Sequence, residues 1–170
     1  ISTFLEMDDT ILYSSCFDAN GGLFETLLGP EDAVISDALN HASLIDGCRA
    51  CRAQVEVFPH ADVEALRMRM AKERHRYGTA LIVSDAVFSM DGDVAPLRDL
   101  RAIADQYDAG LLIDEAHSLG VLGSEGKGAC EEAGIRPDAL VGTLGKAFGA
   151  QGAFVAGTRA LTDLLRNRAR

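Results

Sequence analysis

The chain contains 170 residues, 48% of them hydrophobic, and carries a formal net charge of −10 with a pI near 4.7. This length and composition suit one globular domain with a core of its own, and we expect residues 1–170 to form that single domain. The acidic balance argues against sequence-independent nucleic-acid binding, which needs clustered Lys and Arg to neutralise phosphates.

The chain ends and the cysteines bear on the cellular setting. The sequence begins at Ile1 and ends in an Arg-rich run directly after a predicted helix, so we expect a piece of a longer protein. No apolar run approaches the roughly 20 residues of a membrane span and no signal-peptide pattern is present, which favours a cytosolic protein. The cysteines lack the spacing of a disulfide framework. Cys48 and Cys51 resemble half of a zinc site, but no second pair follows, so we expect no metal site.

Short β-rich runs alternate with helical patterns along the chain, which is typical of a mostly parallel sheet covered on both faces. We predict strands near Ile11–Ser14, Ala33–Ser36, Gln54–Phe58, Ala80–Ser84, Gly110–Ile113, Ala139–Gly142 and Ala153–Ala156. We predict helices near Asp18–Leu28, His41–Cys51, Asp62–Arg76, Leu97–Tyr107 and Thr158–Arg168. The predicted fold is α/β, with three layers (α/β/α) and a seven-stranded, mostly parallel sheet in which Ala153–Ala156 is the expected antiparallel strand.

Two predicted strands end in charged residues. The apolar run of residues 111–113 is followed by Asp114, and the strand near Ala139–Gly142 is followed by Thr143 and Lys146. Open α/β sheets bind ligands at the carboxyl ends of their strands, so we expect both charged groups to face one crevice. A lysine amine and a carboxylate across one crevice are what pyridoxal phosphate (PLP) requires, because the amine forms a Schiff base and the anion keeps the pyridine nitrogen protonated.

The Schiff-base lysine can be chosen by elimination, because the sequence has three lysines. Lys72 lies among charges on a predicted solvated helix, and Lys127 lies in a glycine-flanked loop where an ordinary amine is expected. Lys146 follows an apolar strand, and its neighbours Gly145 and Ala147 leave room for a flat ring. We expect burial beside other polar groups to make the Lys146 amine nucleophilic; a surface lysine in a glycine-rich turn is the alternative.

The segment from Asp114 to His117 spells D-E-A-H, which also marks a class of helicases. A helicase needs an upstream phosphate loop of the form G-x-x-x-x-G-K-[ST], and the sequence has none. We therefore favour Asp114 as the partner of the pyridine nitrogen. His117, three residues on, is positioned to reach the phenolic oxygen of the cofactor, and a structural histidine is the alternative.

The segment from Ser14 to Gly22 joins the first predicted strand to a helix, so backbone N–H groups at the start of that helix are free to hold a phosphate. Such a turn is weak evidence alone, because a doubly wound sheet has several. The hydroxyl of Thr143, three residues before Lys146, is placed to complete this phosphate site.

Two further positions are candidates for the same crevice. His41 opens a predicted helix and is expected to lie flat on a planar heterocycle, with a local polar contact as the alternative. Ser89 follows the strand near Ala80–Ser84 and is expected to reach the crevice. His60 and His75 are predicted to be a loop residue and a solvated helix residue without a role in the site.

With these residues in place, the chain resembles the α-oxoamine synthases, PLP enzymes of fold type I that condense an amino acid with an acyl-CoA. The similarity runs through nearly the whole chain, and five motifs occur in the family's order: Cys16-Phe17, residues 40–43, residues 88–92, residues 114–117 and residues 142–146. By that resemblance, Lys146 is a catalytic residue that forms the Schiff base, Asp114 pairs with the pyridine nitrogen and His117 contacts the phenolic oxygen.

The resemblance also implies roles for the remaining candidates. His41 is expected to stack on the ring and face the substrate, as a second catalytic residue. Cys16 and Phe17 are expected to bind the phosphate end, and Ser89 and Thr143 to add cofactor contacts.

The substrates follow from the same resemblance. The run from Leu12 to Gly29 resembles the branch of the family that condenses glycine with acetyl-CoA to give 2-amino-3-ketobutyrate and CoA. The run from Phe148 to Phe154 is more similar to branches that use other amino acids or longer acyl-CoA chains. The family implies a homodimer and a small domain, absent from this chain, whose arginine holds the substrate carboxylate. An aminotransferase or a non-catalytic scaffold on the same fold are the alternatives.

Overall fold

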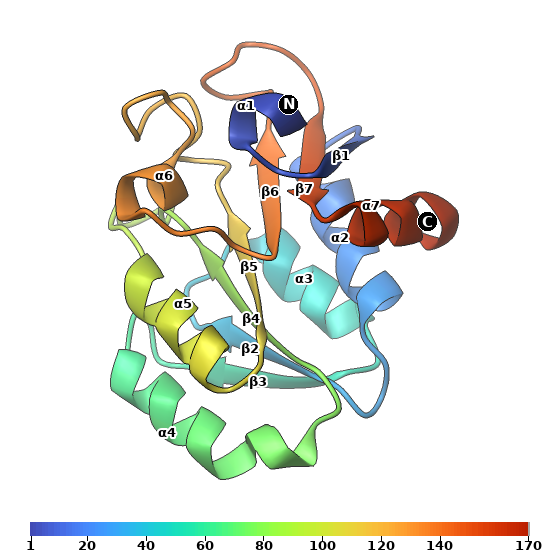
Figure 1. Cartoon of the computed structure of the whole chain (residues 1–170), viewed down its shortest axis with the longest axis vertical. Helices are drawn as coiled ribbons and strands as arrows, with labels where there is room; N and C mark the ends of the chain where they lie inside the picture. The colour runs from blue at the N-terminus through green and yellow to red at the C-terminus, as the bar shows by residue number, and fades with distance from the viewer. Residues whose placement is uncertain (170) are drawn as a thin grey trace.

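A seven-stranded sheet runs through residues 1–169, the part of the chain that this computed structural model describes (Figure 1). Its order is β1-β7-β6-β5-β4-β2-β3, and within it β7 runs antiparallel to both of its neighbours, β1 and β6. The strands are β1 (Asp9–Tyr13), β2 (Ala33–Asp37), β3 (Gln54–Phe58), β4 (Ala80–Asp85), β5 (Gly110–Asp114), β6 (Ala139–Thr143) and β7 (Ala153–Gly157).

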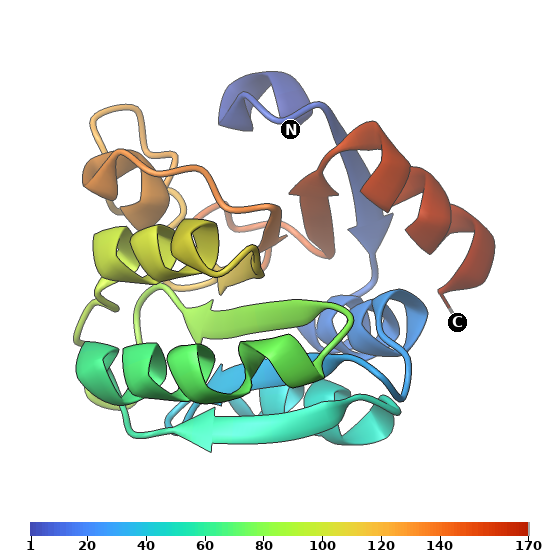
Figure 2. The ribbon, with the colours of Figure 1, turned by 60° about the horizontal axis from the view of Figure 1, so that its bottom comes forward.

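Helices cover both faces of this sheet, as Figures 1 and 2 show. On one face lie α2 (Cys16–Leu27), α3 (Ala42–Ala50) and α7 (Arg159–Arg168). On the other lie α4 (Val63–Glu73), which continues into the 3₁₀ turn η1 (Arg74–Arg76), α5 (Leu97–Gln106) and α6 (Ala129–Ala133). A short helix, α1 (Ser2–Leu5), precedes β1. None of the helices within residues 1–169 is both long and apolar enough to span a bilayer.

The central strands are hydrophobic on both sides because each side is covered. In β2, Ile35 packs in the cluster formed with α4 and α5, while Val34 packs in the cluster formed with α2 and α3. In β4, Ile82 points to the first cluster and Val83 to the second. Such continuous apolar runs are typical of parallel strands buried on both faces, and they carry the polar residues that follow them to the carboxyl edge of the sheet.

The seven strands predicted from the sequence are all present, each within two residues of its predicted bounds, and the reversed strand is the predicted one. The predicted helix Asp62–Arg76 is correct up to Glu73, after which the last turn tightens into η1. Asp62 caps α4, because its side chain accepts the N–H of Ala65 at 2.9 Å.

Two helices, α1 and α6, were not predicted. The N-terminus of α6 depends on a residue far away in the sequence, since the buried carboxylate of Glu115 accepts the N–H groups of Ala129 at 3.0 Å and Cys130 at 2.7 Å. Glu115 also accepts the hydroxyl of Ser118. The second letter of the D-E-A-H segment is therefore a structural helix cap.

Because α3 packs closely on α2, we predict that alanine substitutions at two glycines have opposite effects on stability. A Cβ at Gly47 would lie 2.7 Å from the backbone oxygen of Asn20 and 2.8 Å from Cδ2 of Phe24, whereas a Cβ at Gly21 would meet nothing within 4 Å. We expect Gly47→Ala to lower the free energy of unfolding by about 1–3 kcal/mol. The control Gly21→Ala should raise it by about 0.5–1 kcal/mol, because alanine is the better helix former. Urea denaturation of both variants measures this, and equal effects would contradict the close approach.

Candidate active site

Three neighbouring strands end in polar residues at the same edge of the sheet. β4 ends in Asp85, β5 in Asp114 and β6 in Thr143. Asp85 and Asp114 are directly paired across the parallel β4–β5 ladder. The loop from β6 to β7, which crosses the top of Figure 1, carries Lys146 beyond Thr143. The sheet thus brings together the two charged groups that the sequence singled out.

Asp114 is buried, and its carboxylate is held from two directions. Oδ1 accepts the N–H of Ala116 at 2.9 Å, and Oδ2 accepts the side-chain amide of Asn20 at 2.9 Å. The same amide donates to Oγ of Ser43 at 2.9 Å, so α2 connects Asp114 to the start of α3. These hydrogen bonds fix the orientation of the carboxylate and leave lone pairs for a further donor.

Lys146 and His117 meet at the same edge, with Nζ of Lys146 2.9 Å from Nε2 of His117. Burial and the positive charge of Lys146 lower the pKa of His117, although the carboxylate of Asp114 opposes the effect. A neutral imidazole results, which can accept a hydrogen bond from the amine. The predicted burial of Lys146 is wrong: its side chain is exposed, because it lies in the β6–β7 loop rather than at the end of the strand.

The other two lysines are engaged elsewhere. Lys127 lies 2.6 Å from carboxylate oxygens of both Glu125 and Glu6, and these hydrogen bonds raise its pKa above that of an ordinary amine. The prediction that the Lys127 amine keeps an ordinary pKa is therefore wrong. Lys72 is exposed on α4 and lies 3.6 Å from Glu73. Lys127 is held by two carboxylates and Lys72 lies on α4, whereas Lys146 contacts His117 at the edge that holds Asp114, which strengthens the choice of Lys146.

The start of α2 lies in the same neighbourhood as Lys146. Burial and the nearby Asp114 carboxylate raise the pKa of the Cys16 thiol to about 12, while Lys146 and the hydroxyl of Thr143 act in the opposite direction. Cys16 is the first residue of α2, so the N-terminus of this helix, the end of β6 and the candidate lysine converge. This convergence is what a phosphate site built from Cys16 and Thr143 requires.

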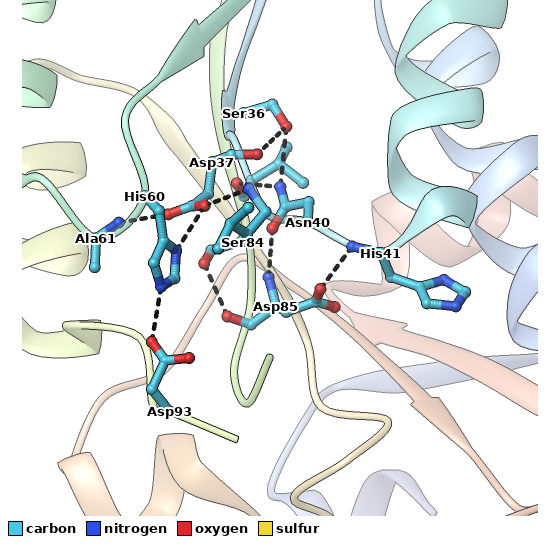
Figure 3. Close-up of polar contacts among 11 residues, drawn as sticks. Ser36, Asp37, Asn40, His41, His60, Ala61, Ser84, Asp85 and Asp93 are labelled. Atoms are coloured by element: carbon cyan, nitrogen blue, oxygen red, sulfur yellow. Dashed lines mark hydrogen bonds and ion pairs between the residues drawn. The ribbon is translucent and has the colours of Figure 1, made fainter. Parts of the chain in front are cut away.

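His41 caps α3 and is tied to Asp85. Its backbone N–H donates to Oδ2 of Asp85 at 2.7 Å, and its Nδ1 accepts the N–H of Ser43 at 3.2 Å. Figure 3 shows the imidazole extending away from Asp85 and Asn40, and the residue is exposed. A local polar contact therefore exists, and a stacking role for His41 stays a prediction.

Phe17 and Ser89 are both exposed. Phe17 follows Cys16 in the first turn of α2, and its side chain is available at the proposed phosphate end. Ser89 lies in the hairpin after β4, and within residues 1–169 its hydroxyl makes no hydrogen bond. Their cofactor contacts stay predictions.

Sequence reasoning missed Asp85 and Asn20. Burial and the adjacent Asp114 raise the pKa of Asp85 to about 7, and its backbone N–H donates to Oδ1 of Asn40 at 2.8 Å (Figure 3). A signal was available for Asp85, since it follows an apolar strand as Asp114 does. Asn20 gave no such signal, because only the fold brings its helix face to β5.

The residues at this edge fit the cofactor that the sequence predicts. PLP needs an amine, an anion for its pyridine nitrogen and a partner for its phenolic oxygen, and Lys146, Asp114 and His117 supply these chemical groups. Within residues 1–169, the buried Oδ1 of Asn20 has no hydrogen-bond partner, so this site retains acceptor capacity. In the same range no cluster of three or more His, Cys, Asp or Glu side chains is arranged to hold a metal ion.

The chain belongs to the family described as aminotransferase class I and II, whose family model matches residues 2–170. Its relatives are α-oxoamine synthases, so the resemblance seen in the sequence is confirmed. It is 49% identical over 175 residues to the 2-amino-3-ketobutyrate coenzyme A ligase of Escherichia coli (strain K12), covering 100% of this chain and 44% of that enzyme. It is 51% identical over 168 residues to the 8-amino-7-oxononanoate synthase of Bordetella petrii, covering 98% of this chain and 42% of that enzyme.

Solved structures give the same family. A serine palmitoyltransferase from S. paucimobilis with a bound PLP–myriocin adduct superposes with a TM-score of 0.94 at 36% identity, covering 99% of this chain and 43% of that one. The 8-amino-7-oxononanoate synthase of Francisella tularensis superposes with a TM-score of 0.81 at 32% identity, covering 99% of this chain and 50% of that one. The chain therefore spans half or less of the length of these relatives.

The raised pKa of Asp85 predicts that replacing it with a neutral residue stabilises the folded protein by an amount that depends on pH. Between about pH 4 and pH 7 the folded protein keeps a proton on Asp85 that the unfolded chain has lost, so Asp85 makes the wild type less stable as pH rises. Asp85→Asn should therefore gain stability relative to the wild type across this window, on the order of 2–4 kcal/mol. Denaturation of cofactor-free protein at several pH values measures this. Asp46→Asn, an exposed Asp-to-Asn change on α3, controls for the substitution itself, and a flat difference for Asp85→Asn would contradict the burial effect.

Proposed function

We propose that the protein containing this chain is a PLP-dependent acyltransferase that condenses glycine with acetyl-CoA, giving 2-amino-3-ketobutyrate and CoA. The observation that carries this proposal is the Lys146 amine, 2.9 Å from His117, at the sheet edge where Asp114 is buried and oriented. The glycine and acetyl specificity is supported by the run from Leu12 to Gly29 and by the similarity to the E. coli 2-amino-3-ketobutyrate coenzyme A ligase.

Bound PLP supplies an electron-accepting ring that stabilises negative charge at the α-carbon of the amino acid. The Lys146 amine would hold the cofactor and would accept the proton from the α-carbon of the amino acid. Asp114, oriented by Asn20 and Ala116, holds a proton on the ring nitrogen. His117 would donate a ring N–H to the phenolic oxygen of the cofactor.

The remaining residues hold and shield the cofactor. The start of α2, with Cys16 and Phe17, and the hydroxyl of Thr143 bind its phosphate end. His41 lies against the ring and faces the substrate, and Ser89 adds a contact from the hairpin after β4. The single large PLP-binding domain, the homodimer and the cytosolic setting complete the proposal as predictions from the sequence.

A second candidate function has specific support. The run from Phe148 to Phe154 is more similar to 8-amino-7-oxononanoate synthase and serine palmitoyltransferase, and the chain is 51% identical to the former enzyme of Bordetella petrii. In this alternative the same lysine and carboxylate serve the condensation of another amino acid with a longer acyl-CoA.

CoA release tests the reaction and its substrates. With glycine present, the intact protein that contains this chain should release CoA from acetyl-CoA, followed with a thiol reagent, faster than from longer acyl-CoA esters. Lys146→Ala should lower kcat by about 10²–10⁴-fold, because the group that moves the α-proton is lost. Lys72→Ala, on the exposed face of α4, is the matched control and should retain wild-type turnover.

Three outcomes would contradict parts of the proposal. Amino transfer to a keto acid without CoA release would indicate an aminotransferase. Preference for a longer acyl-CoA would favour the second candidate. Absence of both reactions and of any visible cofactor absorption would favour a non-catalytic scaffold.

A further inference from the structure

His60 joins three loops that leave neighbouring strands (Figure 3). It follows β3, and its ring lies between Asp37, the last residue of β2, and Asp93, in the hairpin after β4. Nδ1 of His60 is 3.0 Å from Oδ1 of Asp37, and Nε2 is 2.8 Å from Oδ2 of Asp93. One side chain therefore connects the carboxyl ends of β3, β2 and β4.

The Asp37 side of this contact shapes the turn that leads to His41. The Asp37 carboxylate is buried and accepts the N–H groups of Leu39 and Ala61, each at 2.8 Å. The backbone N–H of Asn40 donates to the Asp37 carbonyl at 3.4 Å. His41 is the next residue, so the position of Asp37 sets where α3 and its histidine begin.

The Asp93 side holds the hairpin that carries Ser89. Backbone hydrogen bonds close this hairpin, from Phe88 N–H to the Asp93 carbonyl at 3.0 Å and from Gly92 N–H to the Phe88 carbonyl at 2.8 Å. The ring of His60 also packs edge-on against the buried ring of Phe88, with centroids 4.4 Å apart. His60 thus contacts the hairpin through its ion pair with Asp93 and through the ring of Phe88.

The two carboxylates select one protonation state of His60. A carboxylate oxygen only accepts, so both ring nitrogens are satisfied only when each carries a proton. Burial alone lowers the pKa of His60, but the hydrogen bonds to Asp37 and Asp93 outweigh it and raise the pKa above 6.5. Asp37 and Asp93 are the charged groups in hydrogen-bond contact with the ring.

We propose that His60 is a positioning residue for the active site: by holding Asp37 and Asp93, it fixes both the hairpin that carries Ser89 and the turn that carries His41. This inference rests on the proposed function for its consequence at the cofactor. His60 was predicted to be a loop residue without a role in the site, but its ring contacts the end of β2 and the hairpin after β4.

The contacts of His60 with Asp37 and Asp93 are called the clamp below. Hydrogen exchange of the cofactor-free full chain tests whether the clamp holds the hairpin. The amides of Phe88, Gly92 and Ala95 each have a backbone acceptor, so their exchange reports opening of the hairpin. His60→Asn should speed their exchange about tenfold or more without changing the amides of β5. His75→Asn, which replaces an exposed histidine of η1, is the matched control and should leave all of them unchanged.

Variants at Asp93 separate a specific contact from general loosening. Asp93→Asn keeps an acceptor oxygen for Nε2 and should retain most of the hairpin protection, whereas Asp93→Ala should lose it. In the wild type, protection corrected for intrinsic exchange should fall as pH rises through the raised pKa of His60, because one of the two hydrogen bonds is then lost. Asp93→Ala should lack this transition, and it serves as the test if His60→Asn fails to fold.

Cofactor binding gives the second measurement. PLP titrated by visible absorbance should bind His60→Asn about tenfold more weakly than the wild type or His75→Asn. Unchanged hairpin exchange in both His60→Asn and Asp93→Ala would overturn the clamp, and a loosened hairpin with wild-type PLP affinity would overturn the positioning role. A wild type that does not bind PLP, with the exchange result intact, would instead reject the proposed function.

Discussion

A carboxylate buried at the end of a strand must be held by hydrogen-bond donors, and the way Asp114 is held organises the candidate site. Its donors are the amide of Asn20, from α2, and the backbone of Ala116, from the loop after β5. Because the Asn20 amide also reaches Ser43, the two helices on that face are positioned relative to β5. The sheet edge that faces Lys146 and His117 therefore depends on the Asp114 carboxylate and on the groups that donate hydrogen bonds to it.

Asp85 and Asp114 lie side by side at the ends of β4 and β5, so the charge of one acid affects the other. Asp85 lies next to Asp114 and has its pKa raised to about 7 by burial and by that neighbour. A proton on Asp85 relieves the repulsion that two buried carboxylates would experience. Asp85 also accepts the N–H of His41, so the start of α3 depends on the same pair. Asp85 thus orients the backbone at the start of α3, whereas Asp114 is available to a ligand.

Local patterns in the sequence were sufficient to predict the sheet and to predict that Lys146, His117 and Asp114 lie at one edge of it. Short continuous apolar runs such as β2 and β4 marked buried strands, and elimination among three lysines selected Lys146. The missed features depend on contacts between residues distant in the chain. Asn20 and Asp114 are 94 positions apart, and His60 and Asp93 are 33 apart. Helix α6 was missed for the same reason, because Glu115 caps it from another loop. Exposure of Lys146 was missed because the strand pattern does not show where the following loop turns.

Borohydride reduction of the PLP-loaded full chain, followed by peptide mapping, tests the central claim that Lys146 holds the cofactor opposite Asp114. Reduction converts a Schiff base into a stable secondary amine, so the pyridoxyl mass marks the lysine that was bound. We predict this mass on the peptide that contains Lys146. Its appearance on Lys72 or Lys127 instead would contradict the site.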